Sequence, residues 1–280
     1  MRFGFHVSIY GSIDLSVERA EELGCNTFQI FTRSPRQWKS LRIAPETART
    51  FRNKVKNSDI KPVFAHMPYL PNLASPRDEI YTKSIKTLNS ELERCSLLNI
   101  PFLVTHLGSH LGAGKQEGFS RLINGIDEAL STSEKRVTLL LENTAGTKNS
   151  MGSTFEDLNH IIESLTYPEM IGICFDTSHA FAAGYDLRTE NNIENTIQKI
   201  EELIGFKRLK IVHLNDSRGE FNSHIDRHEH IGLGNIGEEG FRNLLASKFN
   251  KIPMIMETPK DSRRDDIGNM KKVKELAIGL

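Results

Sequence analysis

The sequence is poor in cysteine, and its three cysteines, Cys25, Cys95 and Cys174, lie far apart. No CxxC pair occurs, which argues against a cysteine-rich zinc module. An odd and dispersed set also argues against a disulfide-stabilised secreted domain. We therefore expect reduced thiols in a cytoplasmic protein.

Long apolar runs are also absent. A membrane span takes roughly 18 or more consecutive apolar residues, and no segment approaches that length. The first residues lead directly into a strand-like run at 2–8, without the charged, apolar and cleavable regions of a secretion signal. We expect a soluble intracellular monomer with no membrane partner.

Net charge is the third absence. Lys+Arg and Asp+Glu each total 36, so the formal net charge of the 280 residues is +0. A protein that holds DNA through its overall charge is basic. If this chain binds a nucleic acid, local basic patches or bound cations must supply the positive field.

What the sequence does contain is a regular alternation of short apolar runs and helical patterns. Between Tyr81 and Cys95, for example, apolar residues recur every three or four positions and predict one apolar helix face. The apolar run at 137–141 is typical of a parallel strand buried on both faces. The candidate strands are 2–8, 26–31, 62–66, 101–106, 137–142, 170–176, 209–213 and 253–257.

Eight strands, each followed by a helix, predict an α/β fold of the (β/α)8 TIM-barrel type. Neither a linker nor a low-complexity segment divides the chain, so we expect a single domain over residues 1–280. An open doubly wound sheet is the structural alternative. It is disfavoured because no GxGxxG motif follows the first strand.

Six consecutive candidate strands end on a residue type that binds metals. In chain order these residues are His66, His106, Glu142, Asp176, His213 and Glu257. His179 follows the sixth strand closely, and Asp226 and His228 lie in the long loop after the seventh. Because the carboxyl ends of all barrel strands meet at one mouth, we expect these side chains to converge there.

A lone histidine at a strand end is usually only a satisfied polar side chain. Several carboxylates crowded together, however, repel one another and are costly to bury without compensation. Divalent cations are the natural compensation, and carboxylates with imidazoles and no sulfur suit zinc, with Mn²⁺ or Fe²⁺ as substitutes. The set exceeds the needs of one tetrahedral ion, and clustered divalent ions suit phosphodiester hydrolysis.

Several motifs resemble those of the endonuclease IV family of zinc-dependent abasic-site endonucleases. They are HVS at 6–8, FTRSPRQW at 31–38, LENTAG at 141–146, FDTSHAFAAGYD at 175–186, HLND at 213–216 and DRHEHIGLGNIG at 226–237. The similarity extends over nearly the whole chain. It implies a DNA-repair enzyme that hydrolyses the phosphodiester 5′ to an abasic site in double-stranded DNA. Such an enzyme leaves a 3′-hydroxyl end and also removes 3′-blocking groups.

The resemblance implies three zinc ions per chain. His66 and His106 would hold one ion, and Glu142 would bridge it to a second. Asp176, His213 and Glu257 would complete the second site, while His179, Asp226 and His228 would hold the third. Glu142 and Glu257 would be the catalytic carboxylates, and Glu257 is expected to orient or deprotonate the attacking water. Every one of these positions carries the expected residue type.

DNA contacts are expected in the loops at the mouth. The resemblance implies that Arg36, Tyr69 and Leu70 fill the gap in the base stack at the damaged site. Arg33 lies in the same loop as Arg36 and adds to its positive charge. Arg218 and Arg227 are expected to contact phosphates.

Two other functions stay open at this point. A metal-dependent sugar isomerase or epimerase on the same barrel would have no use for the third ligand set. A non-catalytic nucleic-acid-binding protein would be expected to have lost ligands. Among the remaining histidines, His6 is expected to point into the mouth and His110 to support the first metal site. His160 is expected to be exposed, and His224 and His230 stay unassigned.

Overall fold

The computed structural model describes residues 1–133 and 137–280. A closed barrel of eight parallel strands forms its centre, with the strand order β1-β10-β7-β6-β5-β4-β3-β2. The barrel strands are β1 (Phe3–Val7), β2 (Phe28–Phe31), β3 (Val63–His66), β4 (Phe102–Thr105), β5 (Thr138–Glu142), β6 (Ile171–Asp176), β7 (Leu209–His213) and β10 (Met254–Met256). The predicted TIM barrel is confirmed, and the open doubly wound sheet is excluded by the closure between β1 and β10.

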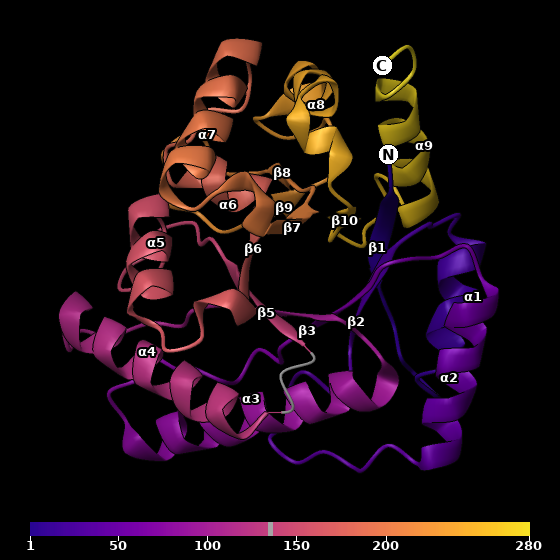
Figure 1. The fold of residues 1–280 in the computed structure, drawn as a ribbon. Coiled ribbons are helices and arrows are strands. Elements are labelled where there is room, and N and C mark those ends of the chain that lie inside the picture. Colours follow the sequence, from indigo (N-terminus) through magenta and orange to yellow (C-terminus); the bar gives the residue numbers. More distant parts are fainter. Residues whose placement is uncertain (134–136) are drawn as a thin grey trace.

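Helices surround the barrel as an outer ring, and the first strand and the last helix lie side by side where the ring closes (Figure 1). The helices are α1 (Leu15–Glu22), α2 (Pro45–Asn57), α3 (Asp78–Leu98), α4 (Lys115–Thr132), α5 (Phe155–Ser164), α6 (Thr177–Ala182), α7 (Glu190–Leu203), α8 (Gly237–Ala246) and α9 (Asp266–Leu276). Three 3₁₀ turns are η1 (Pro168–Met170), η2 (Phe206–Arg208) and η3 (Lys248–Lys251). No helix in the described part of the chain is long and apolar enough to cross a membrane.

Two details differ from the simple strand–helix alternation. The sixth strand is followed by two helices, α6 and α7, and the seventh by a short antiparallel pair, β8 (Asp216–Ser217) and β9 (His228–Glu229). His228 therefore lies on a strand rather than in an irregular loop. β7 has the predicted bounds, but the other barrel strands are shorter than predicted. His106 and Glu257 are therefore the first residues beyond β4 and β10.

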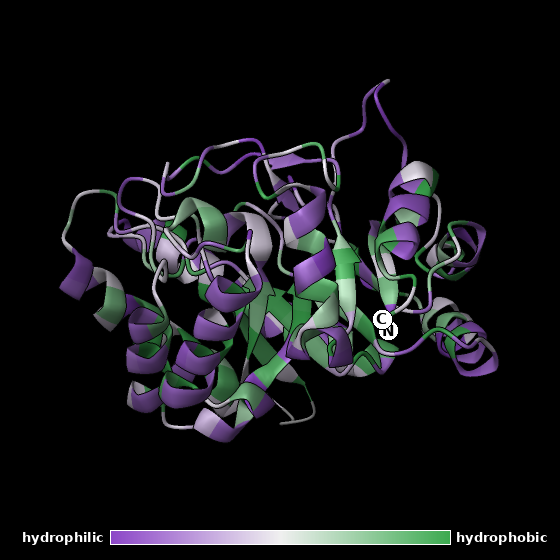
Figure 2. Cartoon of the chain, turned by 90° about the horizontal axis from the view of Figure 1, so that it is seen from above, coloured by the Kyte–Doolittle hydropathy of each residue, from purple (hydrophilic) through white to green (hydrophobic). Residues whose placement is uncertain are grey.

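The apolar residues form two cores. A large one lies between the strands and the surrounding helices, where Figure 2 shows the hydrophobic sides of the helices turned toward the central strands. A small one fills the inside of the barrel and consists of Phe64, Val104, Leu140, Cys174, Ile211 and Ile255, one residue from each of six strands. Because side chains alternate along a strand, the residue two positions further on points to the same interior.

That alternation places the predicted ligands. Two residues after the inner-core positions come His66, His106, Glu142, Asp176, His213 and Glu257. The apolar layer therefore forms the floor of the mouth, and the polar layer lies directly above it. Gly4 lets β1 lie against Thr27, the residue before β2, since a Cβ atom on Gly4 would lie 1.8 Å from the carbonyl oxygen of Thr27.

Candidate metal centre

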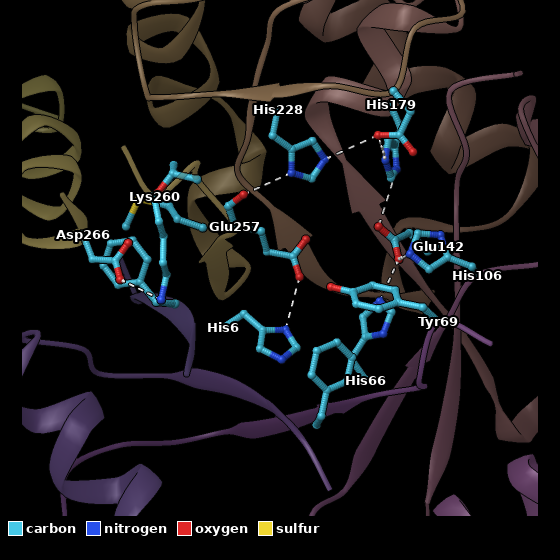
Figure 3. A pocket seen from close by; sticks show the side chains of 15 residues that line it. His6, His66, Tyr69, His106, Glu142, His179, His228, Glu257, Lys260 and Asp266 are labelled. Atoms are coloured by element: carbon cyan, nitrogen blue, oxygen red, sulfur yellow. Dashed lines mark hydrogen bonds and ion pairs between the residues drawn. The ribbon is translucent and has the colours of Figure 1, made fainter. Parts of the chain in front are cut away.

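Glu142 is the central carboxylate of the polar layer. Its Oε2 atom lies 3.2 Å from Nε2 of His66 and 3.5 Å from Nε2 of His106. Its Oε1 atom lies 3.0 Å from Nδ1 of His213, and that nitrogen is 3.4 Å from Oε2 of Glu257. One buried carboxylate thus faces histidines from three other strands, as Figure 3 shows for two of them.

A second concentration of ligands lies beside the first. The Asp176 carboxylate accepts a hydrogen bond of 2.7 Å from the backbone N–H of His179 and so caps α6. His179 Nε2 lies 3.2 Å from Oδ1 of Asp226. His228 Nε2 lies 3.7 Å from Asp176 Oδ2 and 3.9 Å from Asp226 Oδ1. The ring of His228 is fixed by a 3.1 Å hydrogen bond that its Nδ1 donates to the carbonyl oxygen of Glu257.

The segment that carries the last two predicted ligands is organised by Asp216. This buried carboxylate accepts hydrogen bonds of 2.8 to 3.0 Å from the backbone N–H groups of Ser217, Gly232, Gly234 and Ile236. Gly234 is required there, because a Cβ atom would lie 2.5 Å from Asp216 Oδ1. Although burial raises the pKa of Asp216, the four N–H groups bind its ionised form well.

In three groups of described residues, the ligand atoms of each group all lie within 4.8 Å of one another, and these groups contain most of the predicted metal ligands. They are His66, His106 and Glu142; Glu142, Asp176, His213 and Glu257; and Asp176, His179 and His228. The third group contains Asp176 where the resemblance implies Asp226, which instead lies next to both histidines. A fourth group includes the Cys174 thiol with Glu142 and His213, but burial raises the pKa of Cys174, so the thiol stays protonated.

The electrostatics of the cluster favour added positive charge. Burial opposes the charged form of His179, yet the carboxylates of Asp176, Asp226 and Glu142 raise its pKa to about 10. The pKa of His213 is likewise raised well above its usual value, against the effect of burial. For Glu142 burial also opposes ionisation, and the surrounding histidines hold the pKa of its carboxyl well below the usual range.

These shifts and one unsatisfied atom provide the test of whether metal ions fit. The His228 Nε2 atom is buried and has no hydrogen-bond partner among the described residues, although it faces two carboxylates. In the absence of metal the carboxylates retain protons on neighbouring imidazoles. Divalent cations would replace those protons and would satisfy both the imidazole nitrogens and the carboxylate oxygens. The residues present therefore fit a cluster of divalent metal ions.

Two polar side chains in this layer were not singled out from the sequence. Asn215 donates a 2.7 Å hydrogen bond to Asp176 Oδ2 and accepts one of 2.8 Å from the backbone N–H of Glu257. Gln29 contacts both His213 and Glu257 from strand β2. The available signal was the alternation along the second strand, where a lone glutamine occurs among apolar residues.

The other histidines separate into two classes. His6 does point into the mouth, with Nδ1 3.3 Å from Glu257 Oε1. His110 accepts hydrogen bonds from the backbone N–H groups of its own loop, His224 contacts the carbonyl oxygen of Ala145, and His230 pairs with Asp261. The side chains of His110, His224 and His230 therefore stabilise loops, and these hydrogen bonds do not involve the predicted metal ligands. The exposed position of His160 is confirmed.

The expected DNA-contact residues lie around the mouth. Arg36, Arg218 and Arg227 are exposed, and Tyr69 and Leu70 expose 62% and 37% of their surface. Tyr69 also lines the cavity of about 370 Å³ that contains the ligands, and its ring packs edge-on against Phe31 at 5.2 Å.

Arg33 does not belong to this exposed set, contrary to expectation. Its guanidinium is buried against the carboxylate of Glu91 on α3, which also accepts a 2.7 Å hydrogen bond from Thr32. Arg94 donates hydrogen bonds to Thr32 Oγ1 at 2.7 Å and to the carbonyl oxygen of Leu41 at 2.8 Å. These contacts anchor both ends of the loop that carries Arg36.

Comparison with known proteins agrees with the fold and the site. The family model described as "Xylose isomerase-like TIM barrel" matches residues 17–277. A curated relative from Methanoculleus marisnigri, named "Probable endonuclease 4", is 54% identical over 276 residues, which cover 98% of each chain.

Solved structures divide into a close relative and more distant ones. The crystal structure of endonuclease IV from Thermus thermophilus superimposes with a TM-score of 0.88 at 34% identity, covering 99% of this chain and 98% of that one. A D-tagatose 3-epimerase-like protein reaches a TM-score of 0.73 at 22% identity, covering 99% and 97%, and shares the fold alone. The chain therefore belongs to the endonuclease IV family of DNA-repair hydrolases.

Proposed function

We propose that the protein hydrolyses the phosphodiester bond 5′ to an abasic site in double-stranded DNA, and that it removes 3′-blocking groups, with three zinc ions. The observation that supports this best is the geometry around Glu142, whose two oxygens face histidines from different strands within 3.0 to 3.5 Å. A single carboxylate with this arrangement suits a bridging ligand between two ions.

The ligands we assign follow the family pattern. His66, His106 and Glu142 would hold the first ion, and Glu142, Asp176, His213 and Glu257 would hold the second. His179, Asp226 and His228 would hold the third, and the Asp176 carboxylate also lies next to the two histidines. When bound, the ions supply positive charge for the phosphate oxygens, lower the pKa of water and stabilise the leaving oxygen.

The chain's own groups perform the remaining tasks. Glu257 belongs to the second ligand group and also lines the cavity, and 21% of its side chain is exposed, so water can reach it. The carboxylate is anionic because neighbouring histidines outweigh burial and hold its pKa well below the usual range. We assign Glu257 to orient the attacking water and accept its proton. Glu142 fixes the relative positions of the histidines.

Damage recognition is assigned to the mouth loops. Tyr69 lies over the cavity and Arg36 is exposed on the loop anchored by Glu91. An abasic nucleotide is extruded at low cost because it has no base to unpair, and Arg36, Tyr69 and Leu70 would fill the space it leaves. Arg218 and Arg227 lie on adjacent backbone segments, joined by a 2.9 Å hydrogen bond, and would contact phosphates. We assign these roles to a monomer in the cytoplasm, associated with the nucleoid when it is on DNA.

The test is a nicking assay on duplex DNA with one tetrahydrofuran abasic analogue. We expect a single cut 5′ to the analogue, a 3′-hydroxyl product, loss of cutting with a chelator and recovery with Zn²⁺. Elemental analysis of the purified protein should give about three ions per chain, as the ligand count requires. No cutting at full metal loading, or one ion per chain at saturation, would contradict the proposal.

The sugar isomerase or epimerase alternative predicts a different result. Such an enzyme acts at carbon and needs one or two ions, so the third ligand group would have no function in it. The Asp176, His179 and His228 atoms nevertheless lie within 4.8 Å of one another. Isomerisation of a ketose without nicking of abasic DNA would support that alternative.

A further inference from the structure

Gln29 is a buried polar side chain on the inner face of the barrel. It lies on β2, opposite His6 of β1 and Phe64 of β3 in the strand register, and none of its surface is exposed. Its neighbours in sequence, Phe28 and Ile30, point to the outer core. Burying an amide in this way is costly unless its hydrogen bonds are made.

Three contacts fix the orientation of the Gln29 amide. Its Oε1 atom lies 3.0 Å from Nε2 of His213, and its Nε2 atom lies 2.9 Å from Glu257 Oε1 and 3.0 Å from His6 Nδ1. The reversed orientation would place the amide oxygen against the Glu257 carboxylate, which is repulsive. The amide nitrogen therefore donates to Glu257 and His6, and the amide oxygen accepts from His213.

The contact with His213 determines which of its nitrogens is free. An amide oxygen only accepts, so the hydrogen of His213 must be on Nε2. In the metal-free protein Nδ1 faces Glu142 at 3.0 Å and Glu257 at 3.4 Å and also carries a proton. When that proton is lost, the hydrogen that remains is on Nε2, and Nδ1 has the free lone pair that a metal ligand needs. A partner that holds the distal N–H of a ligating histidine fixes the ring and its tautomer.

The contact with Glu257 determines how that carboxylate is turned. Gln29 holds Oε1, so Oε2 is the oxygen directed toward His213 and the ligand cluster. His6 packs on the other side, with its Nδ1 atom 3.3 Å from the same Oε1, and receives the second N–H of the amide. One side chain therefore sets both a ligand and the proposed base.

We propose that Gln29 is a positioning residue of this metal centre: its amide would hold His213 in the tautomer whose Nδ1 is free to bind metal, and it turns Oε2 of Glu257 toward the ligand cluster. The inference rests on the proposed ligand roles of His213 and Glu257. Its test includes metal binding and a histidine signal, neither of which requires DNA cleavage, so its failure is distinguishable from failure of the proposed function.

Gln29→Met keeps the approximate size of the side chain and removes all three hydrogen bonds. In metal-stripped full-length protein titrated with Zn²⁺ against a chromogenic chelator, we expect the dissociation constant of at least one ion to rise about 10- to 100-fold. The Nε2–H proton of His213 should disappear from, or shift in, the downfield proton spectrum of the loaded protein. It is assigned by its loss in His213→Asn. With saturating zinc, kcat on abasic duplex should fall more than KM changes.

Gln29→Glu separates the two contacts. A carboxylate still accepts from His213 Nε2–H but no longer donates to Glu257. We expect the His213 signal to be retained while kcat falls at least about tenfold, since Glu257 loses the donor that turns it. The matched control is Gln198→Met, a change of an exposed glutamine on α7 whose side chain donates to Glu202 on the same helix. It should leave metal affinity, the signal and kcat unchanged.

The outcomes divide clearly. Unchanged zinc affinities within about threefold in folded Gln29→Met, or a lowered melting temperature with no change in metal binding and the His213 signal, would overturn the proposal. If Gln29→Met does not fold, Gln29→Glu decides. A retained signal with reduced kcat supports the proposal, and wild-type kcat, or loss of the signal, contradicts it.

Discussion

Metal uptake by the stripped protein should release protons, and the number follows from the shifted histidines. Ligating imidazoles must be neutral. The carboxylates around His179 raise its pKa to about 10 against the effect of burial, and the pKa of His213 is also raised well above its usual value. At a pH of about 7.5 His179 is therefore protonated in the metal-free protein, and loading should displace at least about one proton per chain.

The same shift links stability to pH. A histidine whose pKa is raised by folding stabilises the metal-free fold below its unfolded pKa of about 6.5, and that contribution is lost as pH rises through the folded value. For His179 the difference between 6.5 and about 10 sets an upper limit of about 5 kcal/mol. The metal-free protein should become less stable between about pH 6.5 and 10. In the zinc-loaded protein a ligating His179 is neutral and makes no such contribution, so this pH dependence should be absent.

Isothermal titration of zinc in buffers of different ionisation enthalpy measures the proton count. His179→Asn should lower that count by about one and flatten the pH dependence of the metal-free melting temperature. His160→Asn, a change of an exposed histidine on α5, should do neither. Zinc binding at about pH 7.5 with no proton release would refute the reasoning, because the carboxylates would then not be holding protons on these rings.

Three sets of variants test the other assignments. Glu257→Gln should keep the fold and lose at least about 100-fold in cleavage rate. His110→Ala removes only loop contacts and should reduce the cleavage rate much less. Near-wild-type cleavage by metal-loaded Glu257→Gln would exclude the role assigned to Glu257. Arg36→Ala with Tyr69→Ala should keep its metal. Each truncation should weaken productive binding of abasic duplex by roughly 5- to 150-fold, at about 1–3 kcal/mol per stacked group. Equal losses on bis-(p-nitrophenyl) phosphate would show that these residues support the metal centre instead. Glu91→Ala leaves a buried guanidinium without its partner and should reduce unfolding stability in urea by about 3 to 5 kcal/mol; a change below about 1 kcal/mol would mean that the pair does not anchor the loop.

The convergence of the ligands was predictable because it depends on period and topology alone. Parallel strands of a barrel all end at one mouth, and alternation carries the interior face two residues beyond each inner-core position. Leu140 and Glu142 illustrate the rule on β5, and Ile211 and His213 on β7. Approximate strand positions were therefore enough to predict which residues meet, even though most strands are shorter than predicted.

Contacts between layers were not predictable in the same way. The burial of Arg33 depends on Glu91, which lies 58 residues further along the chain on α3, so its sequence neighbours suggested an exposed basic loop. Whether Asp176 or Asp226 lies closer to His179 and His228 depends on the path of the chain after β7. Asp216 holds part of that segment through the backbone N–H groups of Gly232 and Gly234. Gln29 was missed because a lone amide in an apolar strand has meaning only once its partners are known.

The absence of net charge is consistent with a DNA substrate when charge is considered locally. Arg36, Arg218 and Arg227 are exposed at the mouth, while a formal charge of +0 over the chain gives no long-range attraction for phosphate. The ligand cluster is itself rich in carboxylates, and they raise the pKa of His179 so far that the cluster gains positive charge even from a proton. Divalent ions bound there would reverse the sign of the field at the point where the scissile phosphate must lie. Affinity for DNA would then depend on the loaded metal more than on the composition of the surface.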